Sequence, residues 1–130
     1  MKIDIVFSDI DGTLLDSEKR LSDTTIDTFE RIKDKTPIVL ISSRMPSAMY
    51  HLQKSANIDH FPTIAYNGGL IIHDKKILID QFIPTTIIQD LVNYNKDLDV
   101  HISLFNNDDW YVPRNDYCCL LYTSPSPRDA

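Results

Sequence analysis

The stretch that decides the fold is Ile5–Leu15, which reads IVFSDIDGTLL. An apolar run stops there at two carboxylates, Asp9 and Asp11, that are separated by one residue. Two carboxylates about 5 Å apart repel each other by about 3 kcal/mol at an effective dielectric constant of 20. A protein tolerates such a pair where a cation neutralises it, or where one carboxyl group keeps a proton for acid–base chemistry. The stretch therefore predicts a buried strand that delivers two acidic groups to a site.

Asp9 and Asp11 suit Mg²⁺, which takes oxygen ligands and commonly binds one or two carboxylates together with phosphate and water. A carboxylate can also attack phosphorus and form an aspartyl-phosphate, while a second carboxylate acts as general acid and base. A solvated turn and a calcium loop are the alternative interpretations. The calcium loop fits poorly, because the glycine comes at the fourth position instead of the sixth and a strand precedes it.

Apolar strands and amphipathic helices alternate over the first half of the chain. The expected elements are a strand at 2–8, a helix at 21–35 capped by Ser22 or Asp23, a strand at 38–41, a helix from Pro46 to 55, and a strand at 63–66. This order predicts an α/β fold with a parallel sheet and right-handed crossovers.

The pattern changes in the second half of the chain. Residues 70–73 and 76–82 predict a hairpin, 84–95 a helix, and 100–105 with 110–112 a second hairpin. We expect the parallel, doubly wound part to end near Phe82 and a different, antiparallel element to begin near Pro84.

The chain has three glycines, Gly12, Gly68 and Gly69, and each follows a predicted parallel strand. Ligands bind outside the carboxyl ends of such strands, and glycine lets the backbone approach a ligand closely. The glycines therefore indicate a ligand site at this edge of the sheet. For Gly68 and Gly69, a tight turn without a ligand is the alternative.

Three motifs carry a resemblance to a known family. The segment DIDGTLL at 9–15 resembles the first motif of the haloacid dehalogenase superfamily of phosphohydrolases. ISSR at 41–44 falls where the Cof-type branch (subclass IIB) has Ala-Thr-Gly-Arg, and AYNGG at 65–69 resembles that branch's Asn-Gly-Ala segment. The resemblance covers about residues 2–112. It implies a Rossmann-like core whose N-terminal part is 1–83, followed by the start of an α+β cap domain at 84–117.

The resemblance also implies roles for individual residues. Asp9 would be the nucleophile and a metal ligand through its side chain. Asp11 would be the general acid and base, with its backbone carbonyl on the Mg²⁺. The residues that would bind phosphate or substrate are Ser42, Arg44, Asn67 and Gly68. A strand-end cap for Ser42 and a surface charge for Arg44 are the alternatives.

The function that the resemblance implies is a Mg²⁺-dependent phosphatase of small phosphorylated metabolites that works through an aspartyl-phosphate. A phosphomutase of the same branch and a non-catalytic protein that kept the fold are the alternatives. The family's third-motif lysine and its fourth motif, which resembles Gly-Asp-x-x-Asn-Asp, are expected after the cap and are not found here. We therefore expect the gene to encode a longer enzyme and the 130-residue chain itself to be inactive.

Residues 118–130 resemble the translation of a common transposase-type sequencing adapter, and a natural Ser/Pro-rich tail is the alternative. The net charge of −6 argues against a generic nucleic-acid or anionic-membrane binder. No apolar run reaches the roughly 20 residues of a membrane span, and the N-terminus lacks a signal-peptide pattern. We expect a cytoplasmic protein with a small phosphate ester as its partner, and the sequence does not predict an oligomeric state.

Overall fold

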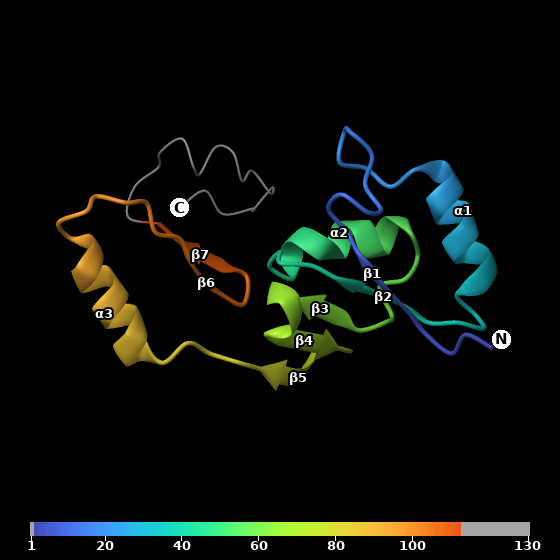
Figure 1. The fold of residues 1–130 in the computed structure, drawn as a ribbon. Helices are drawn as coiled ribbons and strands as arrows, with labels where there is room; N and C mark the ends of the chain where they lie inside the picture. The colour runs from blue at the N-terminus through green and yellow to red at the C-terminus, as the bar shows by residue number, and fades with distance from the viewer. Residues whose placement is uncertain (1, 113–130) are drawn as a thin grey trace. The chain divides into compact units, whose positions relative to one another are not determined.

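The structure is a computed structural model, and it describes residues 2–112. The chain divides into two compact units, Met1–Asp80 and Gln81–Ala130. Figure 1 labels the helices and strands of both. The predicted adapter-derived tail at 118–130 lies outside the described residues. Each unit is described by itself below.

The first unit contains one five-stranded sheet in the order β1-β2-β3-β4-β5. Its elements are β1 (Val6–Asp9), α1 (Asp23–Ile32), β2 (Ile38–Ile41), α2 (Ser47–Ser55), β3 (Thr63–Ala65), the 3₁₀ turn η1 (Tyr66–Gly68), β4 (Leu70–His73) and β5 (Lys76–Asp80). The first three strands are parallel, which confirms the predicted α/β core. β4 and β5 run antiparallel within the same sheet. They form the hairpin predicted at 70–82, and the parallel part therefore ends at β3, earlier than the expected boundary near Phe82.

The ends of both core helices follow from local sequence. Ser22 caps α1, because its hydroxyl accepts a hydrogen bond from the Thr25 backbone N–H at 3.1 Å. Pro46, the predicted first residue of α2, stands at its N-cap position, one residue before the helix begins at Ser47, and contributes no side-chain cap. Its ring fixes φ at a helical value, which favours starting a helix there.

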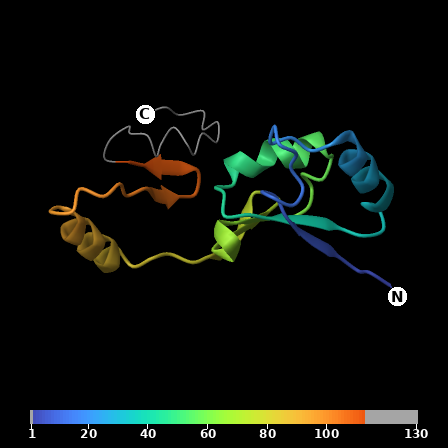
Figure 2. The same ribbon diagram turned by 45° about the horizontal axis from the view of Figure 1, so that its top comes forward.

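One buried cluster joins the two helices to the sheet. Phe29 of α1 and Met49 of α2 pack with Leu40 of β2 in that cluster. Right-handed crossovers between strands in the order β1-β2-β3 place both helices on the same face of the sheet. Figure 2 shows α1 and α2 on one side of the strands. The other buried members of the cluster are Ile10, Ile38, Leu52, Ala56, Ile58, Ala65 and Leu70.

The opposite face of the sheet differs from the doubly wound arrangement that the sequence predicts. Phe7 of β1 lies opposite Val39 of β2 in the parallel register, on the face away from the cluster. No helix of the first unit's described residues covers this face, and Phe7 is 55% exposed. The reason is topological, because a reversal of strand order is needed to send a crossover helix to the second face.

The second unit contains α3 (Thr85–Asn95) and a hairpin of β6 (Leu104–Asn106) and β7 (Asp109–Tyr111). The predicted helix after Pro84 and the predicted hairpin are both present, although β6 is shorter than expected and β7 begins one residue earlier. Phe105 and Trp110 stack with ring centroids 5.9 Å apart. Along residues 2–112, no helix has the length and apolar character that a bilayer span requires.

Replacing Leu40 with alanine tests the position of the core. Leu40 is fully buried in the cluster, so we expect Leu40→Ala to lower the free energy of unfolding by about 2–5 kcal/mol. Leu78→Ala is the matched control, because Leu78 is 59% exposed on β5. Urea denaturation followed by circular dichroism measures both changes. Equal losses in the two variants would contradict this placement of the core.

Candidate active site

A buried isoleucine positions the two carboxylates of the first motif. Ile10 is fully buried, and its carbonyl oxygen accepts hydrogen bonds from the N–H groups of Thr13 and Leu14 at 3.3 and 3.0 Å. Gly12 completes this turn at φ +76°, a backbone conformation that favours glycine. Because Ile10 points into the core, Asp9 and Asp11 on either side of it remain exposed. The motif thus presents both carboxylates to solvent from a fixed turn.

The loops that follow β2 and β3 are joined by backbone hydrogen bonds. The Asn67 N–H donates to the Ser42 carbonyl at 2.9 Å, and the Tyr66 N–H donates to the Arg44 carbonyl at 3.2 Å. Asn67 and Gly68 have positive φ angles of 55° and 98°. These bonds bring together the segments that hold the four predicted phosphate- and substrate-binding residues.

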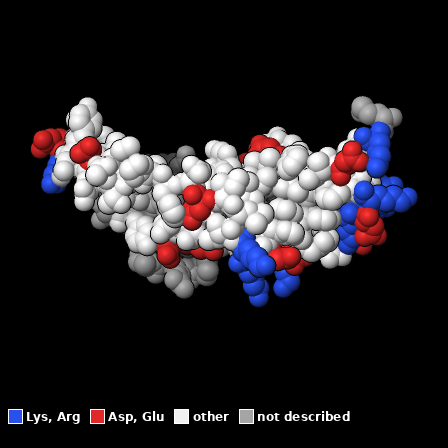
Figure 3. Space-filling model, turned by 90° about the horizontal axis from the view of Figure 1, so that it is seen from below, with Lys and Arg blue, Asp and Glu red and all other residues white. Residues whose placement is uncertain are grey.

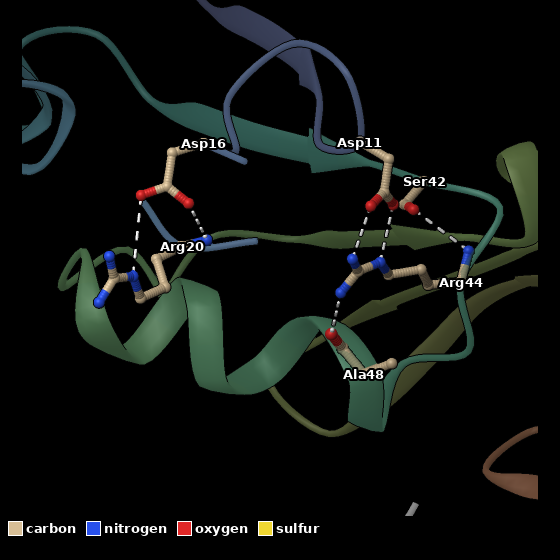
Figure 4. A network of polar contacts seen from close by, with 6 residues as sticks. All are labelled: Asp11, Asp16, Arg20, Ser42, Arg44 and Ala48. Carbon is tan, nitrogen blue, oxygen red and sulfur yellow. Dashed lines mark hydrogen bonds and ion pairs between the residues drawn. The ribbon is translucent and has the colours of Figure 1, made fainter. Parts of the chain in front are cut away.

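Arg44 connects these loops to the first motif. Its Nε donates to Oδ2 of Asp11 at 2.8 Å, and its Nη2 donates to Oδ1 of the same carboxylate at 2.6 Å. A third nitrogen, Nη1, donates to the Ala48 carbonyl in the first turn of α2 at 3.3 Å. Figure 4 shows the guanidinium between the carboxylate and the helix. The arrangement is a bidentate ion pair, the strong form of an arginine–carboxylate contact.

The ion pair sets the protonation preference of Asp11. The hydrogen bond from Arg44 lowers the pKa of Asp11 below its ordinary value of 3.8, and this effect outweighs partial burial, which raises the pKa. The positive charges of Arg44 and Lys19 lower the pKa further. Asp11 is therefore ionised at neutral pH in this state of the site.

Ser42 is buried at the end of β2, with 2% of its surface exposed. Its hydroxyl oxygen accepts a hydrogen bond from the Arg44 backbone N–H at 3.2 Å. This contact is the strand-end cap that the sequence offered as an alternative role. A hydroxyl that accepts in this way still has a proton to donate, so the cap and a contact to phosphate are compatible.

Asp9 occupies a different environment from Asp11. It ends β1, lies opposite Ile41 in the parallel register, and is exposed. Within residues 2–112, its carboxylate has no hydrogen bond or ion pair. An unpaired carboxylate at the carboxyl end of a strand is available for a metal ion or for attack on phosphorus.

The donor set fits Mg²⁺ in part. The Asp9 carboxylate and the Asp11 backbone carbonyl are oxygen donors of the kind that Mg²⁺ takes, and this ion commonly keeps water and phosphate in its remaining positions. Among the described residues, no three His, Cys, Asp or Glu side chains gather as a metal site. Residues 2–112 therefore offer a partial coordination set.

Two neighbours of the site were missed by the sequence analysis. One is the carbonyl of Ala48, which holds Arg44. The other is His51 on α2, whose pKa lies below 6.5 because burial and the positive charge of Arg44 both disfavour its charged form. A histidine on a helix that begins three residues after Arg44 was the only signal available in the sequence.

Charged side chains outside the site are mixed in sign. On the face of the molecule drawn in Figure 3, acidic and basic groups lie interspersed and form no continuous basic surface. This pattern agrees with the net charge of −6. The cationic feature beside Asp11 is therefore local and comes from Arg44 and Lys19.

His51 provides a test of the charge of Arg44. We expect the His51 ring to titrate below pH 6.5 in the wild-type chain, and Arg44→Gln to raise its pKa because a neighbouring positive charge is removed. NMR titration of the histidine Cε1–H signals measures the pKa. Arg20→Gln is the matched control, since Arg20 pairs with Asp16 and Glu18 instead. An unchanged His51 pKa in Arg44→Gln would contradict this electrostatic contact.

The ion pair also predicts how stability depends on pH. A carboxyl group whose pKa is lower in the folded state stabilises the fold above its unfolded pKa, and this contribution is lost as pH falls through the folded pKa. We therefore expect Asp11→Asn to lower the free energy of unfolding more at pH 6 than at pH 2 to 3. The pKa of Asp11 in the folded chain lies below 3.8, so the ion pair that the variant removes is fully formed only at the higher pH. Urea denaturation of the wild-type and variant chains at the two pH values measures this difference. A loss of unfolding free energy that is the same at both pH values would refute the pairing.

Sequence comparison relates the chain to known proteins. Residues 6–126 match the haloacid dehalogenase-like hydrolase family. The chain is 29% identical over 103 residues to the Bacillus subtilis (strain 168) 5-amino-6-(5-phospho-D-ribitylamino)uracil phosphatase YitU, covering 75% of this chain and 37% of the relative.

Solved structures show the same fold. TM0651 from Thermotoga maritima aligns with a TM-score of 0.81 and 29% identity, over 99% of this chain and 48% of that chain. The HAD subclass IIB sugar phosphatase BT4131 aligns with a TM-score of 0.74 and 20% identity, over 92% of this chain and 48% of that one. The chain thus spans less than half the length of these relatives. With the family match over most of its length, the chain belongs to the haloacid dehalogenase-like hydrolases.

Proposed function

We propose that this chain supplies the nucleophile and the acid–base group of a Mg²⁺-dependent phosphatase that acts on small phosphorylated metabolites in the cytoplasm. The observation that carries the proposal is the contrast between two neighbouring carboxylates. Asp9 is exposed at the end of β1 and unpaired within the described residues, while Asp11 is held by Arg44 at 2.6 and 2.8 Å. One group is free to attack, and the other is oriented to move a proton.

In the first proposed step, Asp9 attacks phosphorus. An Oδ–P bond forms, the bond between phosphorus and the ester oxygen breaks, and the leaving oxygen takes a proton from Asp11. In the second step, the ionised Asp11 removes a proton from water, and the water oxygen attacks phosphorus. The Asp9–phosphorus bond then breaks and inorganic phosphate is released, with both carboxyl groups restored.

The Arg44 contact affects the two steps differently. A lowered pKa makes the ionised form of Asp11 dominant, and this is the form that activates water. The protonated form is less populated, but it is a stronger acid toward the leaving oxygen. Mg²⁺, held by the Asp9 carboxylate and the Asp11 carbonyl, would offset the negative charge that gathers on the phosphoryl oxygens.

The remaining predicted site residues fit supporting roles in this proposal. The Ser42 hydroxyl would donate a hydrogen bond to a phosphoryl oxygen. Asn67 and Gly68 would line the entrance of the site. Their loop is tied to Ser42 by the 2.9 Å bond from the Asn67 N–H. Gly68, at φ +98°, holds a turn that a side chain would strain.

The relatives support a phosphatase over a phosphomutase. YitU and BT4131 are both named as phosphatases, and no observation on this chain favours return of the phosphoryl group to the substrate. We also propose that residues 84–117 begin a cap domain. Because residues 2–112 offer no third acidic or histidine ligand, we propose that the 130-residue chain alone has little activity.

Removal of the nucleophile tests the proposal. In the full-length protein, we expect Asp9→Asn to lower kcat for a phosphate ester by about a thousandfold or more, because an amide does not form the aspartyl-phosphate. EDTA should abolish activity, and added Mg²⁺ should restore it. Asp4→Asn is the control, because Asp4 is an exposed acid that pairs with Lys2 at the start of the chain. Full activity in Asp9→Asn, or in EDTA, would overturn the proposal.

A further inference from the structure

We propose that Arg44 is a positioning residue that holds the carboxylate of Asp11, and that it is not a ligand of the substrate phosphate. This inference rests on the proposed function, since Asp11 is the acid–base group there. It assigns Arg44 a role different from the phosphate or substrate contact that the sequence resemblance implies.

The first argument is the use of the guanidinium nitrogens. Nε and Nη2 both donate to Asp11, and Nη1 donates to Ala48. These bonds use three of the five guanidinium N–H groups, one on each nitrogen, and the side chain is only 18% exposed. A phosphate ligand needs donors that point to open solvent, where the phosphate arrives.

The second argument is that the backbone of Arg44 is fixed at both of its polar groups. Its N–H donates to the Ser42 hydroxyl at 3.2 Å, and its carbonyl accepts from the Tyr66 N–H at 3.2 Å. Ser42 is itself buried at the end of β2. The guanidinium is thus anchored to the sheet through its backbone and to α2 through Nη1, so it can transmit that fixed position to Asp11.

A second arginine–aspartate pair, Arg20 with Asp16, differs from the Arg44–Asp11 pair in sequence separation and in exposure. Arg20 and Asp16 lie four residues apart, with their nearest charged atoms at 3.7 Å and the Arg20 side chain 67% exposed. That pair closes its own turn, as Figure 4 shows beside the Arg44 pair. Asp11 and Arg44 are 33 residues apart, so their contact fixes one loop against another.

The Asp11 carboxylate needs such support. Its side chain is 46% exposed and stands on a loop, where a free carboxylate samples several rotamers. Misplacement of a catalytic group by about 1 Å costs on the order of a hundredfold in rate. Lysine keeps the charge of arginine but lacks the planar fork, so it does not bond both carboxylate oxygens and the Ala48 carbonyl together.

Kinetics of the full-length protein separate positioning from phosphate binding. We expect Arg44→Gln and Arg44→Lys to lower kcat by about 10- to 100-fold, while the inhibition constant of inorganic phosphate changes by less than about threefold. Arg20→Gln should change neither quantity. An inhibition constant raised tenfold or more in both Arg44 variants, or an unchanged kcat in both, would overturn the proposal.

NMR on the 130-residue chain tests the contact without activity. We expect the Arg44 Nε–H signal to move on Asp11→Asn, and the Arg20 Nε–H signal to stay in place. An unmoved Arg44 signal would contradict the contact, and this arm remains decisive even if the Arg44 variants fold poorly. The Asp9→Asn variant keeps the two proposals apart. Its full activity refutes the phosphatase mechanism, whereas an inactive Asp9→Asn with unaffected Arg44 variants refutes positioning alone.

Discussion

The parallel pairing of β1 with β2 is the constraint on which the site depends. Its register sets Asp9 opposite Ile41, so both strands end at the same edge of the sheet and their following residues meet there. Asp11 comes two residues after one strand end, and Arg44 comes three residues after the other. An antiparallel pairing would send these segments to opposite edges, and the ion pair between them would not form.

Much of the fold was predictable because its signals are local. Apolar runs, the Ser22 cap and the proline before α2 each act within a few residues, and each gave the right element. The boundaries were less predictable. β1 begins at Val6 instead of residue 2, because a strand extends only over the residues that pair with a neighbouring strand. Its partner β2 begins at Ile38, which lies opposite Val6. The 70–82 hairpin was predicted, but the end of the parallel part was placed too late, because the hairpin pairs with β3 in the core sheet.

The site shows the same division between local and long-range information. The sequence predicted which residues stand at the carboxyl ends of the strands, because strand ends and glycine turns can be read locally. It did not predict the partner of the Arg44 guanidinium. That partner is decided by the sheet register and by the burial of Ile10 between the two aspartates, which are both tertiary features. The lowered pKa of Asp11 follows from the same contact, so the sequence did not predict it either.

Asp9 and Asp11 are chemically identical, so any difference in their roles must come from their surroundings. Enzymes commonly assign acid, base and nucleophile by pushing apart the environments of like groups. Here one guanidinium supplies the difference. Because it bonds both oxygens of Asp11, it neutralises one of the two charges and fixes that carboxylate. Within residues 2–112 the Asp9 carboxylate has no hydrogen bond, which leaves it available for the nucleophilic role proposed above. The repulsion expected between two adjacent carboxylates is thus reduced from within the protein, before any cation arrives.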